Sequence, residues 1–207
     1  MSQLFLATRN PKKIEELRRI LATAIPGSGV LGLDDVTAYD EPAETESTFE
    51  GNALIKARAG LAATGLPSLA DDSGLCVDAL NGMPGVLSAR WGGAAKDDAA
   101  NNRLLLEQLV DVPDDRRGAT FRCAVAFCRP GGGEDVVFGD MRGRIIREQR
   151  GTGGFGYDVV FVPEGETRTS AEMPADEKDA ISHRGTSLRA VAPLVAAALS
   201  ARRGALG

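Results

Sequence analysis

The spacing of apolar residues along the chain predicts strands that alternate with helices. Short apolar runs predict extended segments at Gln3–Ala7, Val30–Val36, Pro67–Ala70, Val86–Trp91 and Val159–Val162. Apolar residues three or four positions apart predict helices at Lys12–Ala22, Ser47–Thr64, Asp97–Val110, Pro174–Ile181 and Thr186–Arg202. Such an alternation is typical of α/β proteins.

Two further runs, Thr120–Arg129 and Asp135–Arg142, are joined by Pro130–Gly133 and predict a hairpin without a chemical role. The chain has no internal repeat, low-complexity tract or composition break that would separate independent domains. We therefore predict one α/β domain over residues 1–207.

The overall charge argues against a polynucleotide partner. The 29 acidic residues outnumber the 24 basic ones and give a net charge of −5, whereas proteins that hold a polynucleotide through its phosphates are usually basic. A small anion needs only a local cluster of Lys, Arg and N–H groups, with a divalent cation bridging it to acidic side chains. The single histidine, His183, excludes a metal site built from several histidines.

The cysteines and the longest apolar run indicate the cytoplasm. Cys76, Cys123 and Cys128 lack CxxC spacing and are typical of small core residues in a reducing compartment. The run Ala190–Leu199 contains Pro193 and is too short to span a bilayer, and the N-terminus has no signal-peptide pattern. We expect a cytoplasmic protein without a membrane partner.

The loop between the first predicted strand and helix has the features of a phosphate site. Asn10 can cap the helix and Pro11 fits its first turn, so free N–H groups and the positive end of the helix dipole would face the loop. Thr8 adds a hydroxyl and Lys13 a positive charge where phosphate binds readily. The same residues also fit an ordinary strand-to-helix junction, and the chain contains no Walker-type loop.

Two adjacent carboxylates follow the short apolar run that ends at Ala70. Asp71 and Asp72 precede Ser73 and the turn-permissive Gly74, at a position where α/β proteins commonly place their chemistry. Successive side chains of a strand point in opposite directions, so one acid can face a cleft while the other ties down neighbouring backbone. Taken alone, the stretch also fits a solvated turn.

Upstream, an acidic loop over Thr37–Glu46 precedes a helix that a capping box, Ser47 with Glu50, would open. Asn52 and Lys56 are four residues apart and share a helix face. These two residues and Glu50 could turn inward, and a solvated helix face is the alternative.

Late in the chain, Gly151–Asp158 has four glycines in eight residues, which usually lets a backbone approach a ligand closely. Phe155 could stack on a planar base, a contact that contributes on the order of 1–3 kcal/mol, or Phe155 and Tyr157 could cover core. Lys178 and the pair His183–Arg184 add cationic and hydrogen-bonding groups.

Together these stretches fit a nucleoside triphosphate with Mg²⁺, which prefers hard oxygen ligands and commonly uses one or two protein acids plus substrate phosphates. In their order and residue identities, the motifs resemble those of the inosine triphosphate pyrophosphatase family, also called the HAM1-like or RdgB-like group. The resemblance covers nearly the whole chain through Leu6–Asn10 with Lys13, Thr48–Phe49, Asn52–Ala53, Lys56–Arg58, Ala70–Leu75, Pro84–Gly85, Ser88–Arg90, Gly151–Asp158, Glu172, Lys178 and Ser182–Gly185.

The resemblance implies a role for each matched position. The triphosphate would be bound by the first loop, Thr8, Arg9, Asn10, Pro11, Lys12 and Lys13. Glu44 and Asp72 would hold Mg²⁺, and Asp72 would also activate water with support from Asp71 and Lys56. Further substrate contacts would come from Ser73, Phe155, Gly156, Tyr157, Asp158, Lys178, His183 and Arg184. The family also implies a homodimer and an α/β fold with an elongated mixed sheet flanked by helices and two lobes around a central substrate cleft.

From these residues we predict that water placed by Asp72 and the metal attacks the α-phosphorus and releases a nucleoside monophosphate and pyrophosphate. Backbone N–H groups and Arg184 would donate to a 6-oxo purine, whereas the 6-amino group of adenine would leave them unpaired. The predicted substrates are the non-standard purine nucleotides ITP, dITP and XTP, whose removal cleanses the nucleotide pool. Two alternatives stay open: a pyrophosphatase with another base preference, such as the Maf-like group, and a non-catalytic nucleotide sensor.

Overall fold

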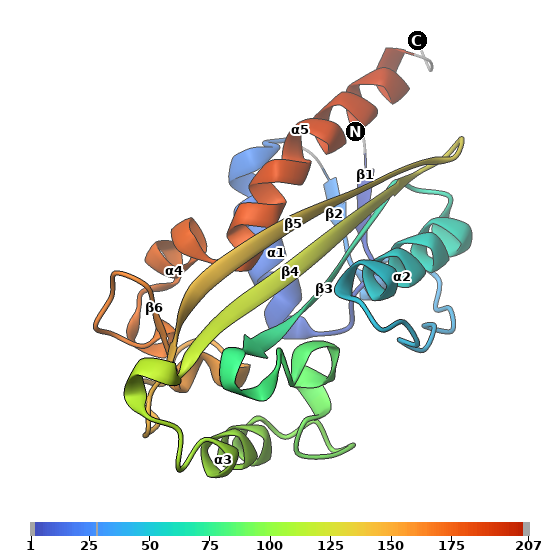
Figure 1. The fold of residues 1–207 in the computed structure, drawn as a ribbon. Helices are drawn as coiled ribbons and strands as arrows, with labels where there is room; N and C mark the ends of the chain where they lie inside the picture. Colours follow the sequence, from blue (N-terminus) through green and yellow to red (C-terminus); the bar gives the residue numbers. More distant parts are fainter. Residues whose placement is uncertain (1–2, 28, 205–207) are drawn as a thin grey trace. The chain divides into compact units, whose positions relative to one another are not determined.

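The computed structural model describes residues 3–27 and 29–204 and has a mixed α/β fold (Figure 1). Six strands form one sheet in the order β2-β1-β3-β4-β5-β6. Their bounds are β1 Gln3–Leu6, β2 Gly29–Leu31, β3 Ser68–Val77, β4 Gly118–Arg129, β5 Gly133–Ile145 and β6 Phe161–Pro163. The α-helices of the described residues are α1 Pro11–Ala24, α2 Phe49–Thr64, α3 Asp98–Gln108, α4 Ala175–Ile181 and α5 His183–Gly204. The predicted fold class, a mixed sheet flanked by helices, is confirmed.

The chain divides into two compact units. The first comprises Met1–Asp72, Cys123–Phe138 and Gly185–Gly207, and the second comprises Ser73–Arg122 and Gly139–Arg184. The division falls inside β3, β4 and β5, so each of these strands contributes residues to both units.

In the first unit, helices cover both faces of the sheet. β1 pairs in parallel with β2 and with β3. Alternate residues of β4 point to opposite sides, so Val125 packs with α1 and α5 while Ala126 packs with α2. A Cβ atom added to Gly60 of α2 would lie 2.5 Å from Ser68 Oγ, so this glycine allows the helix to lie close to the sheet, as the Ala- and Gly-rich sequence predicts.

The second unit has its own core, built around aromatic residues. Phe121 of β4 meets Phe161 of β6 edge to face at a ring separation of 4.7 Å. Leu105 and Leu109 at the end of α3 join this cluster and are fully buried. β5 pairs with β6 in antiparallel fashion, with Arg144 opposite Val162.

Two predicted elements differ from the structure. β2 ends at Leu31, because Asp35 turns back and accepts a hydrogen bond from the N–H of Gly32 at 2.8 Å. The segment predicted to be extended before Trp91 is a 3₁₀ helix, Gly85–Arg90, in which Ser88 donates its hydroxyl to the carbonyl of Gly85 at 2.6 Å. A local side-chain hydrogen bond thus overrides the extended preference of the apolar residues in both places.

Other boundaries shift by one or two residues. Thr48, not Ser47, caps α2 and accepts the N–H of Gly51. β6 begins at Phe161, because Gly156–Val159 forms a 3₁₀ turn before it. The predicted N-cap of α3, Asp97, is confirmed and accepts the N–H of Ala99 at 2.9 Å.

Cys123 and Cys128 are buried core residues as predicted, whereas Cys76 is only partly buried. Cys76, Cys123 and Cys128 form no disulfide with one another. Within the part of the chain that the structure describes, none of the helices combines the length and the apolarity that a membrane span requires.

Candidate active site

Asn10 caps α1 as predicted, and this cap uses the N–H groups of the first turn. Its Oδ1 accepts hydrogen bonds from the N–H of Lys12 at 3.0 Å and of Lys13 at 3.3 Å, while Pro11 has no N–H to offer. Thr8 Oγ1 in turn accepts the N–H of Asn10 at 3.4 Å. The expectation of free N–H groups at this helix start is therefore wrong. An anion here would be attracted by side-chain charge and by the helix dipole.

The two basic residues that flank this cap lie in different surroundings. Lys13 is mostly buried, and its Nζ lies 2.9 Å from Oδ2 of Asp71. Arg9 is exposed, forms a 3.1 Å ion pair with Glu41 and donates to the carbonyl of Tyr39. Lys13 is thus held near the sheet, while Arg9 is attached to the acidic loop.

Asp71 and Asp72 lie inside β3, not after it, which corrects the sequence prediction. The strand continues through Leu75 to Val77, both of them buried, so the pair of acids sits in its middle. As expected for successive strand residues, the two side chains serve different partners: Asp71 pairs with Lys13 of α1, and Asp72 lies near Lys56 of α2.

Lys56 brings two carboxylates together. Its Nζ lies 2.6 Å from Oε1 of Glu44 and 3.7 Å from Oδ1 of Asp72. Burial disfavours the charged ammonium, but Asp72, Asp71 and Glu44 outweigh that effect and raise the pKa of Lys56. Burial also raises the pKa of Asp72, even though Lys56 and Lys13 act in the opposite direction.

Of the inward polar residues predicted on α2, Asn52 and Lys56 are buried, whereas Glu50 is exposed. Asn52 donates a hydrogen bond to Oδ2 of Asp72 at 3.2 Å. One face of α2 therefore contacts both oxygens of Asp72, with a neutral donor on one side and a cation on the other.

The pair Glu44 and Asp72 fits a magnesium ion. Both side chains approach one cationic group in this structure, and their carboxylates are the hard oxygen donors that Mg²⁺ prefers. Among residues 3–27 and 29–204, no group of three or more His, Cys, Asp or Glu side chains gathers to hold a metal. Two protein acids with substrate phosphates completing the coordination are the arrangement that these residues allow.

In the second unit, two cations lie near the ring of Phe155. Lys178 Nζ is 5.4 Å and Arg184 Cζ is 5.5 Å from the centre of its ring. Arg184 also donates from Nη2 to the hydroxyl of Ser73 at 2.8 Å. The chain thus brings together four of the residues predicted to contact the substrate.

His183 and Arg184 are the first residues of α5, which corrects the predicted break before Thr186. Ser182 has extended backbone angles that separate α4 from α5, so the new helix begins immediately after it. The ring of His183 stacks on Phe121 at 4.9 Å with an interplanar angle of 10°. His183 is buried and packs against the core of this unit.

Asp158 and Tyr157 hold the glycine-rich loop from inside. Oδ2 of Asp158 accepts both the N–H of Phe155 at 2.9 Å and the ammonium of Lys178 at 2.7 Å. The Tyr157 hydroxyl donates to the carbonyl of Ser88 at 2.9 Å, and burial raises its pKa. These contacts fix the ring of Phe155 and the charge of Lys178 relative to each other.

Sequence reasoning missed two residues of α3 that hold the same loop. Asp98 Oδ2 accepts the N–H of Gly156 at 2.9 Å, and Asn102 Nδ2 donates to its carbonyl at 2.8 Å. Their spacing of four residues on one helix face was the signal available in the sequence. With the N–H groups of Phe155 and Gly156 bound to carboxylates, Arg184 becomes the main candidate donor to a purine 6-oxo group.

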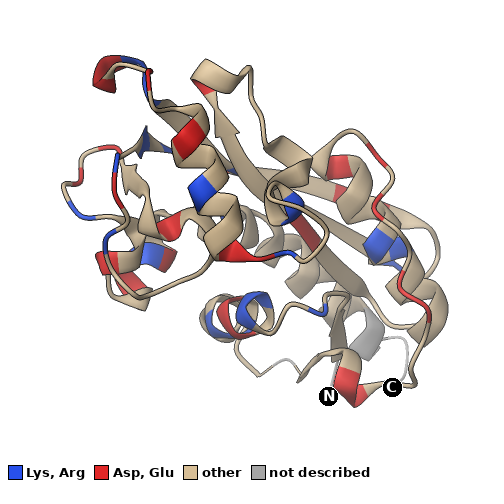
Figure 2. Ribbon diagram, turned by 90° about the horizontal axis from the view of Figure 1, so that it is seen from below, with Lys and Arg blue, Asp and Glu red and all other residues tan. Residues whose placement is uncertain are grey.

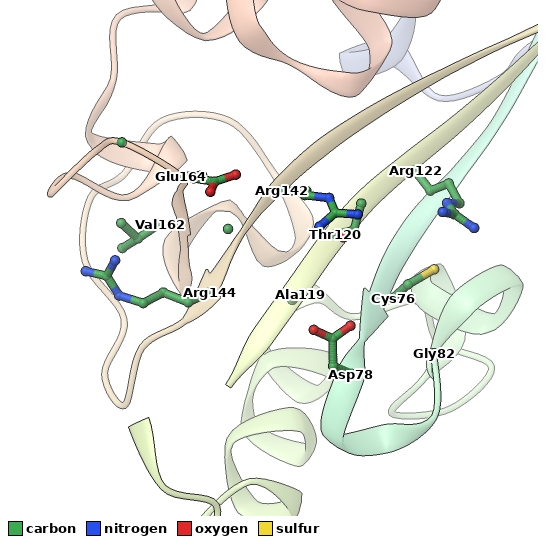
Figure 3. A pocket seen from close by; sticks show the side chains of 12 residues that line it. Cys76, Asp78, Gly82, Ala119, Thr120, Arg122, Arg142, Arg144, Val162 and Glu164 are labelled. Carbon is green, nitrogen blue, oxygen red and sulfur yellow. The ribbon is translucent and has the colours of Figure 1, made fainter. Parts of the chain in front are cut away.

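A pocket of about 570 Å³ lies in the second unit (Figure 3). Its charged lining residues are Arg122, Arg142, Arg144, Asp78 and Glu164. Arg122 is already paired with Asp140 at 3.1 and 3.2 Å, so the charges nearly balance and favour neither sign of ligand. None of the predicted site residues is among the described residues that line it. Basic and acidic positions are likewise interspersed along the ribbon as a whole (Figure 2).

Comparisons with known proteins show the family to which the chain belongs. A model of the Ham1 family matches residues 4–194. A dITP/XTP pyrophosphatase of Nocardia farcinica is 60% identical over 198 residues, covering 95% of this chain and 96% of the relative. One from Streptomyces coelicolor is 54% identical and covers 94% of this chain and 98% of the relative.

Solved structures that resemble this chain come from the same family. The nucleoside-triphosphatase / dITP/XTP pyrophosphatase of Mycobacterium abscessus superposes with a TM-score of 0.75 at 56% identity, covering 91% of this chain and 98% of that one. A HAM1 protein from Coxiella burnetii has a TM-score of 0.84 at 38% identity over 94% of this chain and 98% of that one. With a family match over most of its length and relatives this similar, the chain belongs to the Ham1 family.

Proposed function

We propose that this protein is a hydrolase of nucleotide metabolism that cleaves ITP, dITP and XTP to the nucleoside monophosphate and pyrophosphate. The relatives at 54–60% identity carry the name dITP/XTP pyrophosphatase. The observation that carries the proposal is the approach of Glu44 and Asp72 to one cationic group, Lys56, since Mg²⁺-assisted cleavage of a phosphoric anhydride commonly uses one or two protein carboxylates together with the substrate phosphates.

The residues of the first unit are assigned to the triphosphate. Lys13 supplies positive charge at the start of α1, where the helix dipole also favours an anion, and Asp71 fixes its position. Glu44 and Asp72 would hold Mg²⁺, which when bound neutralises phosphate charge and lowers the pKa of water. Lys56 keeps both acids in place.

Asp72 is assigned the role of orienting the attacking water. A carboxylate that ligates Mg²⁺ has a low proton affinity, so Asp72 would orient the water rather than fully remove its proton. The α-phosphorus is the expected point of attack, because cleavage there releases pyrophosphate in one step. Lys13 would stabilise the negative charge that develops on the departing pyrophosphate.

The residues of the second unit are assigned to the purine and the sugar. Phe155 would stack on the base, and its two neighbouring cations, Lys178 and Arg184, restrict where the ring can lie. A guanidinium donates and cannot accept, so Arg184 would favour a 6-oxo group over the 6-amino group of adenine. This provides a physical reason to prefer ITP and XTP over ATP.

We also propose that the protein acts as a cytoplasmic homodimer without a polynucleotide partner. The net charge of −5 and three cysteines without a disulfide support the compartment and the lack of polynucleotide binding. The homodimer rests on the family resemblance.

A substrate panel with product identification tests the proposal. Purified protein with MgCl₂ is given ITP, XTP, ATP, GTP, UTP or dTTP, and products are separated by ion-exchange chromatography, with Asp72→Asn as the inactive control. Monophosphate and pyrophosphate from ITP and XTP, with little from ATP, are expected. Release of inorganic phosphate, turnover favouring UTP or dTTP, or binding without turnover would instead support a phosphatase, a Maf-like enzyme or a sensor.

A further inference from the structure

Asn52 joins the acidic loop to Asp72 through one buried side chain. Its Oδ1 accepts the N–H of Glu46 at 2.9 Å, and its Nδ2 donates to the carbonyl of Glu46 at 3.2 Å. The same Nδ2 donates to Oδ2 of Asp72 at 3.2 Å. The side chain is 1% exposed, so these bonds form away from competing water and are correspondingly costly to lose.

The orientation of this amide is fixed by its partners. A primary amide has two N–H donors, and here both point to oxygen atoms that can only accept, the carbonyl of Glu46 and the ionised carboxylate of Asp72. Rotating the amide by half a turn would bring its own oxygen against both of them. Asn52 therefore presents a donor to Asp72 and an acceptor to the loop in one arrangement only.

The start of α2 is built to receive this loop. Thr48 caps the helix by accepting the N–H of Gly51 at 3.1 Å. A Cβ atom added to Gly51 would lie 2.6 Å from Cβ of Glu46, so a glycine is needed for the loop to approach the helix this closely. This packing is independent of the Asn52 hydrogen bonds and holds the same loop residue.

Two side chains one helical turn apart then link the two acids. Glu46 is two residues after Glu44 in the chain, so fixing its backbone limits where the Glu44 carboxylate can lie. Lys56 receives that carboxylate at 2.6 Å and faces Oδ1 of Asp72, whereas Asn52 holds Oδ2. The spacing between the carboxylates of Glu44 and Asp72 thus depends on both Asn52 and Lys56.

We propose that Asn52 is a positioning residue that sets the distance and orientation of Glu44 relative to Asp72, and thereby the affinity of this pair for a divalent cation. The proposal rests on the proposed function only in assigning these two acids to the metal. An amide suits this task because it holds a carboxylate without adding a charge. A second lysine would compete with the cation, and an acid would repel Asp72.

The first test measures metal binding alone. Mn²⁺ is titrated into metal-free protein without nucleotide, and unbound Mn²⁺ is followed by electron paramagnetic resonance. Asn52→Ala should bind Mn²⁺ at least tenfold more weakly than the unaltered chain, and Asn52→Asp should show the same loss although it keeps the acceptor for the N–H of Glu46. Glu44→Gln tests whether Mn²⁺ binds at this pair of acids, because loss of the Glu44 carboxylate should also weaken Mn²⁺ binding.

Asn101 provides a matched control. It is also a buried asparagine that bridges two backbone groups, accepting the N–H of Gly92 at 2.6 Å and donating to the carbonyl of Ala89 at 3.2 Å. No carboxylate is among these partners. Asn101→Ala should therefore lower the melting temperature by an amount similar to Asn52→Ala while leaving the Mn²⁺ affinity within twofold.

The second test separates positioning from general damage. The Mg²⁺ concentration that gives half-maximal kcat with ITP should rise at least tenfold in Asn52→Ala, and the KM for ITP at saturating Mg²⁺ should stay within about threefold. Equal metal affinities in Asn52→Ala, Asn52→Asp and the unaltered chain would overturn the proposal, as would Mn²⁺ binding that Glu44→Gln leaves unchanged. If the unaltered chain releases no pyrophosphate from ITP, the proposed function fails, whereas the Mn²⁺ titrations still decide the role of Asn52.

Discussion

The ammonium of Lys13 lies 2.9 Å from Oδ2 of Asp71, whose side chain is completely buried. A buried carboxylate is stable in its charged form only when a cation or hydrogen-bond donors compensate it. The pair therefore has two consequences: it directs Lys13 toward its proposed triphosphate, and it makes the fold depend on Lys13.

Replacing Lys13 by Met should destabilise the protein by about 2–3 kcal/mol, because it removes the cation nearest to a buried charge. The double variant Lys13→Met with Asp71→Asn should regain most of that stability, because the charge that needed compensation is gone. Neither variant should release pyrophosphate from ITP at a normal rate. Urea unfolding and a pyrophosphate assay measure the two effects, and a double variant less stable than Lys13→Met alone would contradict the argument.

The raised pKa of Asp72 predicts a pH effect on stability. Because burial raises this pKa above the ordinary value of 3.8, the folded protein binds the proton more tightly than the unfolded chain. The stability that Asp72 contributes is greatest below the pKa that this carboxyl has in the unfolded chain. It is lost as the pH rises through the pKa that the carboxyl has in the folded protein. The Asp72→Asn variant has no carboxyl to ionise at this position. Its free energy of unfolding, relative to that of the unaltered chain, should therefore increase from about pH 4 upward.

The same variant should lose activity by about 10²–10⁴-fold, the usual contribution of a positioned acid or base. Thermal melts of metal-free protein between pH 4 and pH 7 give the stability difference. Adding MgCl₂ should stabilise the unaltered chain more than Asp72→Asn. A stability difference that stays constant across this pH range would show that Asp72 ionises normally.

The sequence was most informative where structure depends on neighbours in the chain. The caps Asn10 and Asp97 and the inward face of Asn52 and Lys56 follow from local spacing, and the structure confirms them. The pairing of β4 with β5 also follows from two apolar runs and a short turn. In these cases the residues that decide the structure are within a few positions of one another.

The sequence failed where the deciding partner is distant. Asp71 and Asp72 resemble turn residues because their compensating lysines, Lys13 and Lys56, lie on other elements, so β3 was predicted to end too early. Asp98 likewise has its partner, the N–H of Gly156, far along the chain, although its spacing of four residues from Asn102 was a signal on one helix face. Charge compensation between separate elements, as for Asp71 and Asp72, leaves no local periodicity to read.

Removing the ring of Phe155 should weaken substrate binding more than the fold. Phe155→Ala is expected to raise the KM for ITP about tenfold, in line with roughly 1–3 kcal/mol per stacked base. Phe155→Trp should retain a low KM, because it keeps an aromatic face near Lys178 and Arg184. Phe138→Ala is the matched control, because Phe138 is 55% exposed and is not among the predicted site residues. Unchanged KM and kcat in Phe155→Ala would rule out stacking.

Arg117 should be a determinant of stability without a catalytic role. Its side chain donates to the carbonyls of Ile145 at 2.8 Å, Leu109 at 2.6 Å and Ile146 at 3.3 Å, and the residue is 2% exposed. Burial, with a smaller effect from Arg147, lowers its pKa. Arg117→Met should cost about 3 kcal/mol, since buried carbonyls would lose a donor that water cannot easily replace.

Arg147 offers the comparison that isolates burial. It also donates to two backbone carbonyls, those of Val110 and Val112, and it pairs with Asp114, but its side chain is 52% exposed. Water can replace its bonds, so Arg147→Met should cost less than about 1 kcal/mol. Urea unfolding of both variants, with the KM for ITP measured alongside, distinguishes the two cases. If the two substitutions were equally costly, burial would not be the reason that Arg117 stabilises the end of α3.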